Sequence, residues 1–267
     1  MGLTFAPYDP SVCCLCGSSE GLTGEHKVKA SALRSEFGNE SMVIGRVGES
    51  EVLRAAQGPK SKSFHFSTRV CGACNNRNTQ KADLEFDRFN TSARALWASG
   101  KRPRVALDEP RYAIGSAPYL NLFRYFAKLL CCHLAEVGAP RSLILGRFAV
   151  GRSSRNCVWL AVDEDWTFKQ ASAEIGPHQY AAHGGLVVYG HVRTGEPRAF
   201  HSTLTIGAVR YVFYWQLNWL NRLEIKMAHP DFYHWCRGKV EEAKLMPLSE
   251  TEKLVLGLAA EPTNQST

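Results

Sequence analysis

Two pairs of cysteines constrain this chain more than any other feature. Cys13 and Cys16 are separated by two residues, as are Cys71 and Cys74, and residues 17–70 lie between the pairs. A CxxC turn aims both sulfurs at one ion, so two such pairs can close a tetrahedral zinc site. Four free thiols or a redox pair are the alternative, and Cys14 could replace Cys13 as a ligand. We expect a structural zinc ion bound by Cys13, Cys16, Cys71 and Cys74.

The remaining cysteines and the charge indicate the setting of the protein. The chain has nine cysteines, an odd number, and Cys131 and Cys132 are adjacent, which is a poor basis for a disulfide framework. The first residues lack the basic and apolar regions of a signal peptide, and no run approaches the roughly 20 apolar residues that cross a bilayer. We therefore expect a cytoplasmic protein with no membrane partner. The net charge of +7 favours binding to polyanions such as nucleic acid.

The first hundred residues predict two short strands and a helix. Apolar residues at three- and four-residue spacings predict a helix that begins within 75–79 and ends near Ala98. Leu22–Val28 and Phe64–Val70 have the composition of extended segments. Residues 38–63 are rich in Gly and Ser, so we expect a long insertion between the strands.

A second part is expected after the basic, proline-containing stretch Gly100–Arg104, where we place a domain boundary. Tyr119–Val137 is apolar on nearly all sides, which is typical of a buried helix. Strand-like runs and a turn at 193–197 then predict an antiparallel sheet from Ser142–Val150, Asn156–Val162, Gly185–Val192 and Thr203–Gln216. Two further helices are expected, at Asp231–Met246 and Glu250–Ala260. The fold class is thus predicted to be α+β, with residues 101–267 forming a mixed domain.

Glu25-His26 and Asn75 lie close to the cysteine pairs in the sequence, although a structural zinc site needs none of these residues. Glu25-His26 lies on the first predicted strand, after the first pair, and Asn75 directly follows the second pair at the expected start of the helix. In these residues the chain resembles the HNH family of ββα-metal nucleases, in the subset scaffolded by a four-cysteine zinc. The resemblance covers about residues 11–90. It implies a ββα-metal module, with its long insertion, within residues 1–100.

The resemblance implies that the module hydrolyses phosphodiester bonds. His26 would be the general base, since a neutral imidazole can deprotonate water near pH 7. Glu25 and Asn75 would supply the oxygen ligands that a catalytic Mg²⁺ or Mn²⁺ ion prefers. Adjacent strand positions point to opposite faces, so we assume that the twist of the hairpin lets Glu25 and His26 straddle the ion, as in the family. The zinc would hold the hairpin against the helix.

Two positions depart from the family pattern. Glu25 stands where Asp is commoner, and no Asn occurs about five residues before Cys71, where the family has one that orients the catalytic His. His65 is the nearest polar side chain there. It is a candidate orienting residue or metal ligand, and an ordinary strand histidine is the alternative. Asn78 and Asp83 are further candidates for contacting metal or phosphate, with a solvated helix face as the alternative.

Basic residues surround the expected site, and no acid interrupts them. They are Lys60, Lys62, Arg69, Arg77 and Lys81. Contacts of such residues with phosphates give sequence-independent, salt-sensitive affinity, so we expect a nucleic-acid-binding track. The second part carries many aromatic residues, Trp159 and Tyr214 among them. Most are expected in the core or in an interface, and a base-stacking surface is the alternative.

The sequence therefore predicts a metal-dependent endonuclease that acts on nucleic acid, with DNA preferred through the resemblance. Its setting could be restriction, antiphage defence or a mobile element. The alternative is a zinc-stabilised nucleic-acid-binding or interaction module in which Glu25-His26 has no catalytic role. For residues 101–267 we expect a role in target recognition, in forming a homodimer, or in sensing an activating partner.

Overall fold

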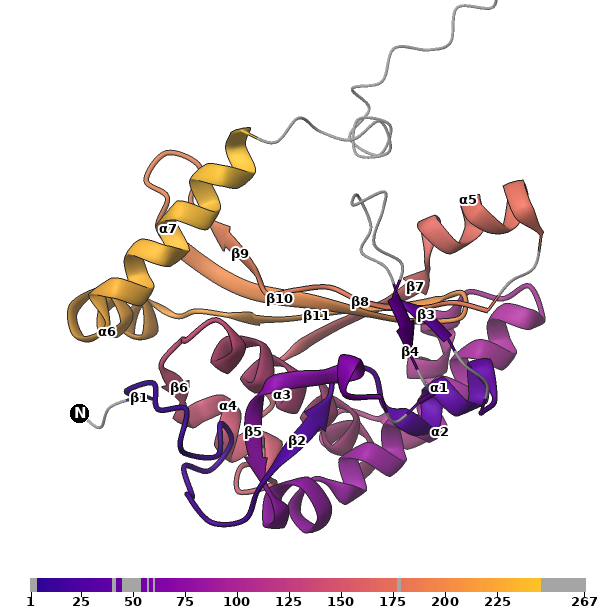
Figure 1. The fold of residues 1–267 in the computed structure, drawn as a ribbon, viewed down its shortest axis with the longest axis horizontal. Helices are drawn as coiled ribbons and strands as arrows, with labels where there is room; N and C mark the ends of the chain where they lie inside the picture. The colour runs from indigo at the N-terminus through magenta and orange to yellow at the C-terminus, as the bar shows by residue number, and fades with distance from the viewer. Residues whose placement is uncertain are drawn as a thin grey trace, which may run out of the picture.

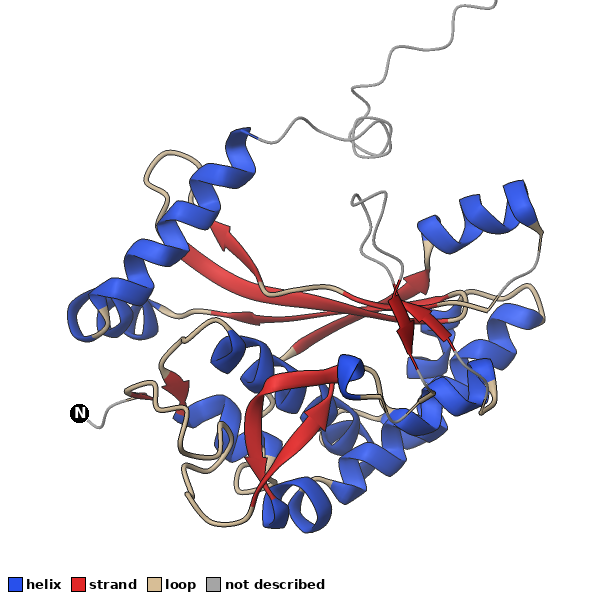
Figure 2. Ribbon diagram, in the orientation of Figure 1, coloured by secondary structure: helices blue, strands red, loops and turns tan. Residues whose placement is uncertain are grey.

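A five-stranded antiparallel sheet runs through the protein, with most of the helices on one side of it (Figure 1). The structure is a computed structural model that describes residues 4–39, 42–44, 54–56, 58–59, 61–176 and 179–245. Helices and antiparallel sheets together make it a mixed α+β fold (Figure 2). The strand order is β7 (Trp159–Glu164), β11 (Val209–Gln216), β10 (Pro197–Ile206) and β8 (Ala181–His183), and β9 (Val187–Gly190) also pairs with β10.

Aromatic side chains join the inner face of this sheet to three helices, namely α2 (Gln80–Ala98), α3 (Ala117–Glu136) and α7 (Pro230–Leu245). Three ring pairs make the contacts, with centroid distances of 5.4 Å for Phe86–Tyr211, 5.1 Å for Phe126–Phe213 and 5.8 Å for Phe232–Phe200. These rings are buried, and rings at such distances add attraction to the burial of apolar area. The core therefore lies between the sheet and α2, α3 and α7.

The first hundred residues form a strand pair followed by a helix. The pair consists of β2 (Leu22–His26) and β5 (His65–Cys71), and a π-helical segment at Ala73–Asn78 leads into α2. Helix α2 ends at Ala98, where Ser99 and Gly100 follow, as the sequence predicts. Helix α1 (Ala30–Phe37) and the short pair β3 (Met42–Ile44) and β4 (Arg54–Ala56) lie between β2 and β5 in the chain. The rest of the predicted insertion lies mostly outside the described residues.

Helix α3 separates the β2–β5 pair from the sheet. On one side, the His133 ring meets the Phe66 ring of β5 at 4.8 Å between centroids. On the other side, His133 Nε2 lies 3.0 Å from Ser202 Oγ of β10. Burial lowers the pKa of His133 to about 3, so the ring is neutral in this apolar setting. The order through the protein is thus strand pair, α3, then sheet.

The predicted domain boundary falls where α2 gives way to two short 3-10 helices, Pro103–Asp108 and Pro110–Tyr112. Buried residues from both sides of this point enter one hydrophobic core. The beginning of the described chain also contacts the second part, since β1 (Phe5–Ala6) pairs with β6 (Arg141–Ser142) and the Thr4 backbone N–H donates to the Glu224 carboxylate.

Several predicted elements are confirmed, and two are wrong. The buried helix near Tyr119–Val137, a turn within residues 191–196 and the helix from Asp231 are all present. The run Ser142–Val150 is not a strand but mainly helix α4 (Leu143–Ala149), and the Ser142 side chain caps this helix by accepting from the Leu145 N–H at 3.2 Å.

The run Thr203–Gln216 is two strands rather than one. Ile206 pairs with Val209, so a two-residue turn at Gly207-Ala208 joins β10 to β11. Gly207 has φ +57°, a conformation that glycine adopts without strain. The helices α5 (Trp166–Ile175) and α6 (Trp219–Ala228) had no sequence prediction. The predicted helix at 250–260 lies outside the described residues.

Candidate functional site

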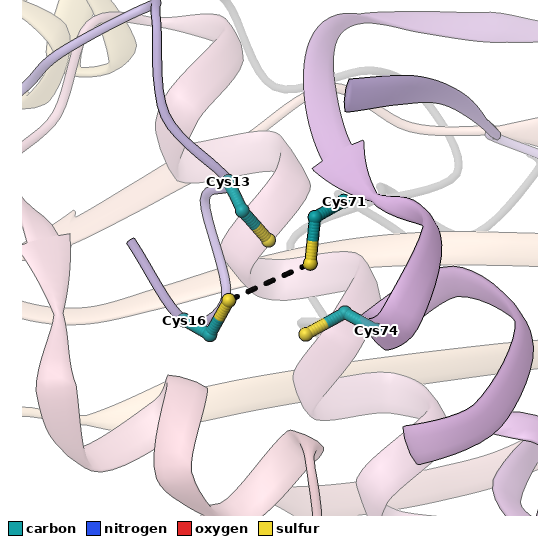
Figure 3. Close-up of side chains that lie close together, drawn as sticks. All are labelled: Cys13, Cys16, Cys71 and Cys74. Carbon is teal, nitrogen blue, oxygen red and sulfur yellow. Dashed lines mark hydrogen bonds between the residues drawn. The ribbon is translucent and has the colours of Figure 1, made fainter. Parts of the chain in front are cut away.

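Four cysteine sulfurs gather at one end of the β2–β5 pair (Figure 3). The sulfur atoms of Cys13, Cys16, Cys71 and Cys74 all lie within 4.8 Å of one another. The first two come from a tight turn in which the Gly17 N–H donates to the Cys13 carbonyl, and Gly17 has φ +81°. The second two flank the junction between β5 and the π-helical segment. Four sulfurs at this spacing could hold a metal ion.

Cys14 does not belong to this cluster. Its sulfur lies 3.8 Å from the sulfur of Cys132 on α3, and both side chains are buried. The choice between Cys13 and Cys14, which spacing left open, is thus made by the direction of the two side chains. The Asn78 amide group donates to the Cys74 sulfur at 3.6 Å, so this candidate for a phosphate contact instead supports a cysteine of the cluster.

Two histidines face each other at the other end of the strand pair. His26 on β2 is the register partner of His65 on β5, and the two Nε2 atoms are 2.9 Å apart. The pairing is irregular between Gly24 and His26, which is how a strand can re-aim a side chain. A Cβ atom on Gly24 would lie 2.8 Å from His65 Nδ1, so the absence of a side chain at Gly24 makes room for the His65 ring.

The His26 imidazole is kept uncharged by its surroundings. Burial is the largest cause, and the neighbouring His65, Lys128 and Arg34 act in the same direction, so the pKa of His26 falls to about 4. A histidine with such a pKa is neutral at pH 7. A neutral imidazole has one donor nitrogen and one acceptor nitrogen. Nε2 makes the contact with His65, so Nδ1 is left for a second partner.

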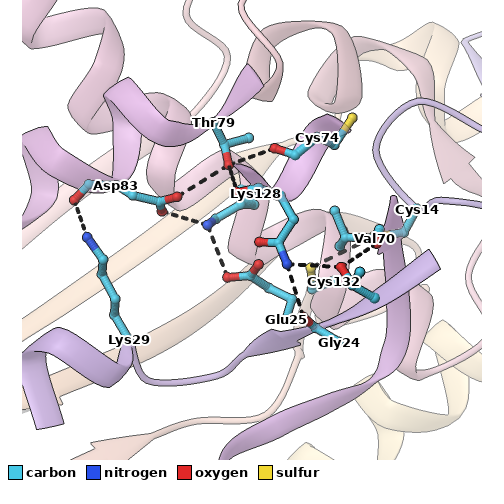
Figure 4. Close-up of polar contacts among 12 residues, drawn as sticks. Cys14, Gly24, Glu25, Lys29, Val70, Cys74, Thr79, Asp83, Lys128 and Cys132 are labelled. Atoms are coloured by element: carbon cyan, nitrogen blue, oxygen red, sulfur yellow. Dashed lines mark hydrogen bonds and ion pairs between the residues drawn. The ribbon is translucent and has the colours of Figure 1, made fainter. Parts of the chain in front are cut away.

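Glu25 is engaged in a buried ion triad rather than left open to solvent (Figure 4). Its carboxylate lies 3.0 Å from Lys128 Nζ, and the same ammonium lies 2.6 Å from Asp83 of α2. Lys128 belongs to α3 and is 2% exposed. Burial by itself would lower the pKa of Lys128, but the Glu25 and Asp83 carboxylates outweigh it and raise the pKa. The triad therefore ties β2, α2 and α3 together through charges.

Asn75 joins the start of the π-helical segment to β2. Its side-chain nitrogen donates to Thr23 Oγ1 at 3.0 Å and to the Gly24 carbonyl at 3.1 Å. These bonds hold the helical segment against the strand between the cysteine cluster and the histidine pair. The Asn75 side chain and the Glu25 carboxylate thus have separate protein partners.

The predicted basic track is exposed where the structure describes it. Lys62, Arg69, Arg77 and Lys81 all have exposed side chains. They lie in the 3-10 turn before β5, on β5, in the π-helical segment and at the start of α2, respectively. Lys60 lies outside the described residues. Exposed charges of this kind are accessible to phosphate groups.

Lys128 and Gly24 are the site residues that the sequence prediction missed. Lys128 lies in a mostly apolar helical run that also contains Arg124 and Glu136, and a charge buried in such a run needs acidic partners. Nothing in the sequence indicates which acids those are, since Glu25 and Asp83 are far from Lys128 in the chain. Gly24 gives no local signal, because its role depends on a ring from another strand.

No protein-family model, curated protein or solved structure matches this chain. The likeness to the HNH family therefore rests on the residues quoted above. Within the described part of the chain, none of the helices has the length and apolar character needed to span a membrane.

Proposed function

We propose that the protein is an HNH-type endonuclease that hydrolyses phosphodiester bonds in DNA, with His26 as the general base. The observation that supports this most is the His26–His65 pair, at one end of a strand pair whose other end carries four clustered cysteines and leads into a helix. This order of strand, strand and helix is the one that the resemblance implies. A zinc ion is the metal that four cysteine ligands suit best.

In the proposed reaction His26 takes a proton from the attacking water. If His26 donates its Nε2–H to His65 Nε2, its Nδ1 keeps a lone pair that can accept this proton. His65 then orients the base, the role that an Asn has in the family. The lowered pKa of His26 keeps the imidazole neutral at physiological pH and also makes it a weaker base than a free histidine.

The zinc would be structural, because it lies away from the proposed base. Leu22 pairs with Cys71 at one end of the strands, and His26 pairs with His65 four residues further along β2. At about 3.3 Å per residue, this separation is about 13 Å. Such a zinc would hold the strand pair against the helix without contacting the scissile phosphate.

The described residues do not form an open oxygen site for a catalytic Mg²⁺ or Mn²⁺ ion. The Glu25 carboxylate is paired with Lys128. Asn75 donates to β2 only through its amide nitrogen, and its amide oxygen by itself does not make a metal site. Among the described residues, the four cysteines are the one group of three or more His, Cys, Asp or Glu side chains close enough to share an ion. We therefore assign no step to a second ion, and the need for Mg²⁺ or Mn²⁺ remains an expectation from the resemblance.

The buried triad favours a second candidate function, a zinc-stabilised nucleic-acid-binding module without catalysis. A carboxylate neutralised by a lysine stabilises the fold and is not available to bind an ion. The exposed Lys62, Arg69, Arg77 and Lys81 would serve this function equally well.

Nicking of supercoiled plasmid separates the two functions. The wild type should nick the plasmid with Mg²⁺ or Mn²⁺ added, and His26→Ala should reduce the rate at least about 10²-fold because the base is lost. Binding of the same DNA, measured by fluorescence anisotropy, should stay nearly unchanged. His234→Ala is the matched control, since His234 is exposed on α7.

Equal nicking by His26→Ala and the wild type would rule out His26 as the base. Tight binding by a wild type that nicks neither single-stranded nor double-stranded DNA with either ion would favour the binding module.

A further inference from the structure

The outer face of the five-stranded sheet carries a row of side chains that crosses four strands. The register places Val187 of β9 opposite His201 of β10, His201 opposite Tyr214 of β11, and Tyr214 opposite Trp159 of β7. Residues directly opposite each other on antiparallel strands point to the same face. The alternate residues of β10 and β11, such as Phe200 and Phe213, are buried against the helices. The row therefore faces away from the core.

Two rings of this face are exposed, the Tyr214 and His201 rings are half-buried, and the four form two near-parallel pairs. Trp159 is 58% exposed and Tyr189 is 55% exposed. The Trp159 and Tyr214 rings are inclined by 10° with centroids 6.2 Å apart, and the Tyr189 and His201 rings are inclined by 25° with centroids 4.6 Å apart. Grouped apolar rings on a protein surface indicate a binding site rather than a chance arrangement.

Positive charge borders the rings on the same face. Arg198 and Gln216 line a shallow depression together with Tyr189, His201 and Tyr214. Arg210 is exposed and lies on the outer face of β11, four residues from Tyr214. Two acids adjoin these guanidinium groups: Asp163 is the register partner of Arg210, and the Glu196 carboxylate lies 3.6 Å from the Arg198 guanidinium. Such a surface suits a polyanion that has exposed planar groups, since these groups can stack on the rings while the negative charges contact the guanidinium groups.

We propose that this outer face binds single-stranded DNA, whose bases stack on Trp159, Tyr189 and Tyr214 while its phosphates contact Arg198 and Arg210. Four strands about 4.8 Å apart give a row of about 14 Å, which accommodates two or three nucleotides. In a duplex the base faces are covered by stacking, so only a single strand can use these rings. Helix α3 and the sheet separate this face from the His26–His65 pair. The inference therefore does not depend on catalysis at His26.

Fluorescence anisotropy of a labelled dT12 oligonucleotide tests the inference on the full chain, without added Mg²⁺ or Mn²⁺. Tyr214→Ala should weaken binding about tenfold, since stacking on one ring is lost, whereas Tyr214→Phe should keep nearly wild-type affinity. Arg210→Gln should make the plot of the logarithm of the binding constant against the logarithm of the salt concentration less steep, by about 1 in slope, because one phosphate contact is lost. Repeating the measurement in the His26→Ala background should give the same changes, which separates this surface from the proposed active site.

Trp219→Ala is the matched control, because Trp219 is 62% exposed on α6, away from the row. A labelled 12-base-pair duplex should not respond to Tyr214→Ala. Equal dT12 binding by Tyr214→Ala and the wild type would overturn the inference, as would tighter binding of U12 than of dT12. A dimer of the wild type that Tyr214→Ala dissociates, seen by sedimentation, would assign the face to a second copy and also overturn it.

Discussion

Lys128 places a full positive charge inside the protein, between two carboxylates from different elements. Removing an ammonium group from water is costly, and the interaction with Glu25 and Asp83 has to offset that cost. The raised pKa of Lys128 indicates that the carboxylates prevail. Because the charges come from β2, α2 and α3, the triad stabilises the position of the strand that carries His26. A structural role of this kind need not include catalysis.

We expect Lys128→Met to lower the free energy of unfolding by about 3 kcal/mol or more at pH 7, because the buried Glu25 carboxylate and the half-buried Asp83 carboxylate lose their shared partner. Urea denaturation at pH 7 measures this loss. The triple variant Lys128→Met, Glu25→Gln, Asp83→Asn should recover part of the stability. A loss below about 1 kcal/mol at pH 7 would mean that the triad contributes little.

Among the elements, α4 has an unexpected role in supporting the cysteine cluster. A Cβ atom on Gly146 would lie 2.2 Å from the Leu15 carbonyl oxygen, within the turn that carries Cys13 and Cys16. Because the neighbouring atom is backbone, the helix and the turn have to move apart to admit even one carbon. Glycine is thus required for the close approach of α4 to the first cysteine pair.

Gly146→Ala should therefore destabilise the protein, by about 1 to 3 kcal/mol as expected for overpacking, although alanine favours helix formation. Gly238→Ala provides the matched control, since Gly238 is inside α7 and its Cβ atom would meet no other atom within 4 Å. That variant should gain up to about 1 kcal/mol. Thermal melting of the two variants compares them directly. A Gly146→Ala protein as stable as Gly238→Ala would contradict the steric role assigned to Gly146.

At the scale of the whole protein, the cysteine cluster and the shared core act together. Phe86 of α2 stacks on Tyr125 of α3 at 4.0 Å and meets Tyr211 of β11, so the two parts of the chain are packed through aromatic rings. The cysteine cluster anchors the beginning of this assembly by joining the turn before β2 to the segment before α2. Because α2 also packs in the core, we expect loss of a metal from the cluster to destabilise the core.

Purified protein should contain about one zinc ion per chain by elemental analysis. Removing it with a strong chelator should lower the Tm by at least about 8 °C, because zinc binding contributes to folding and about 1 kcal/mol corresponds to 2–4 °C in a chain of this size. Cys16→Ser should reproduce the loss. Cys157→Ser is the control, since this half-buried cysteine lies outside the cluster. Metal-free protein with an unchanged Tm and four titratable thiols at the cluster would rule out the zinc site.

Features that depend on neighbouring residues could be predicted from the sequence. The two CxxC spacings, the strands near Glu25-His26 and His65, and the end of α2 at Ser99-Gly100 are local signals, because turns and helix ends are specified by a few adjacent residues. The buried character of α3 also follows from its apolar sequence. Local patterns were therefore sufficient to predict the α+β class and the cysteine cluster.

The pairing of distant side chains was determined by tertiary packing. Cys14 turns toward Cys132 and leaves Cys13 in the cluster, Glu25 pairs with Lys128, and the run after Ser142 becomes a helix packed on Leu15. Each outcome depends on a partner far away in the chain, and periodicity or spacing carries no information about such partners. An apolar run can be a strand or a buried helix, and a carboxylate can bind an ion or a lysine. Which of the two structures or partners occurs depends on the residues that tertiary packing brings into contact.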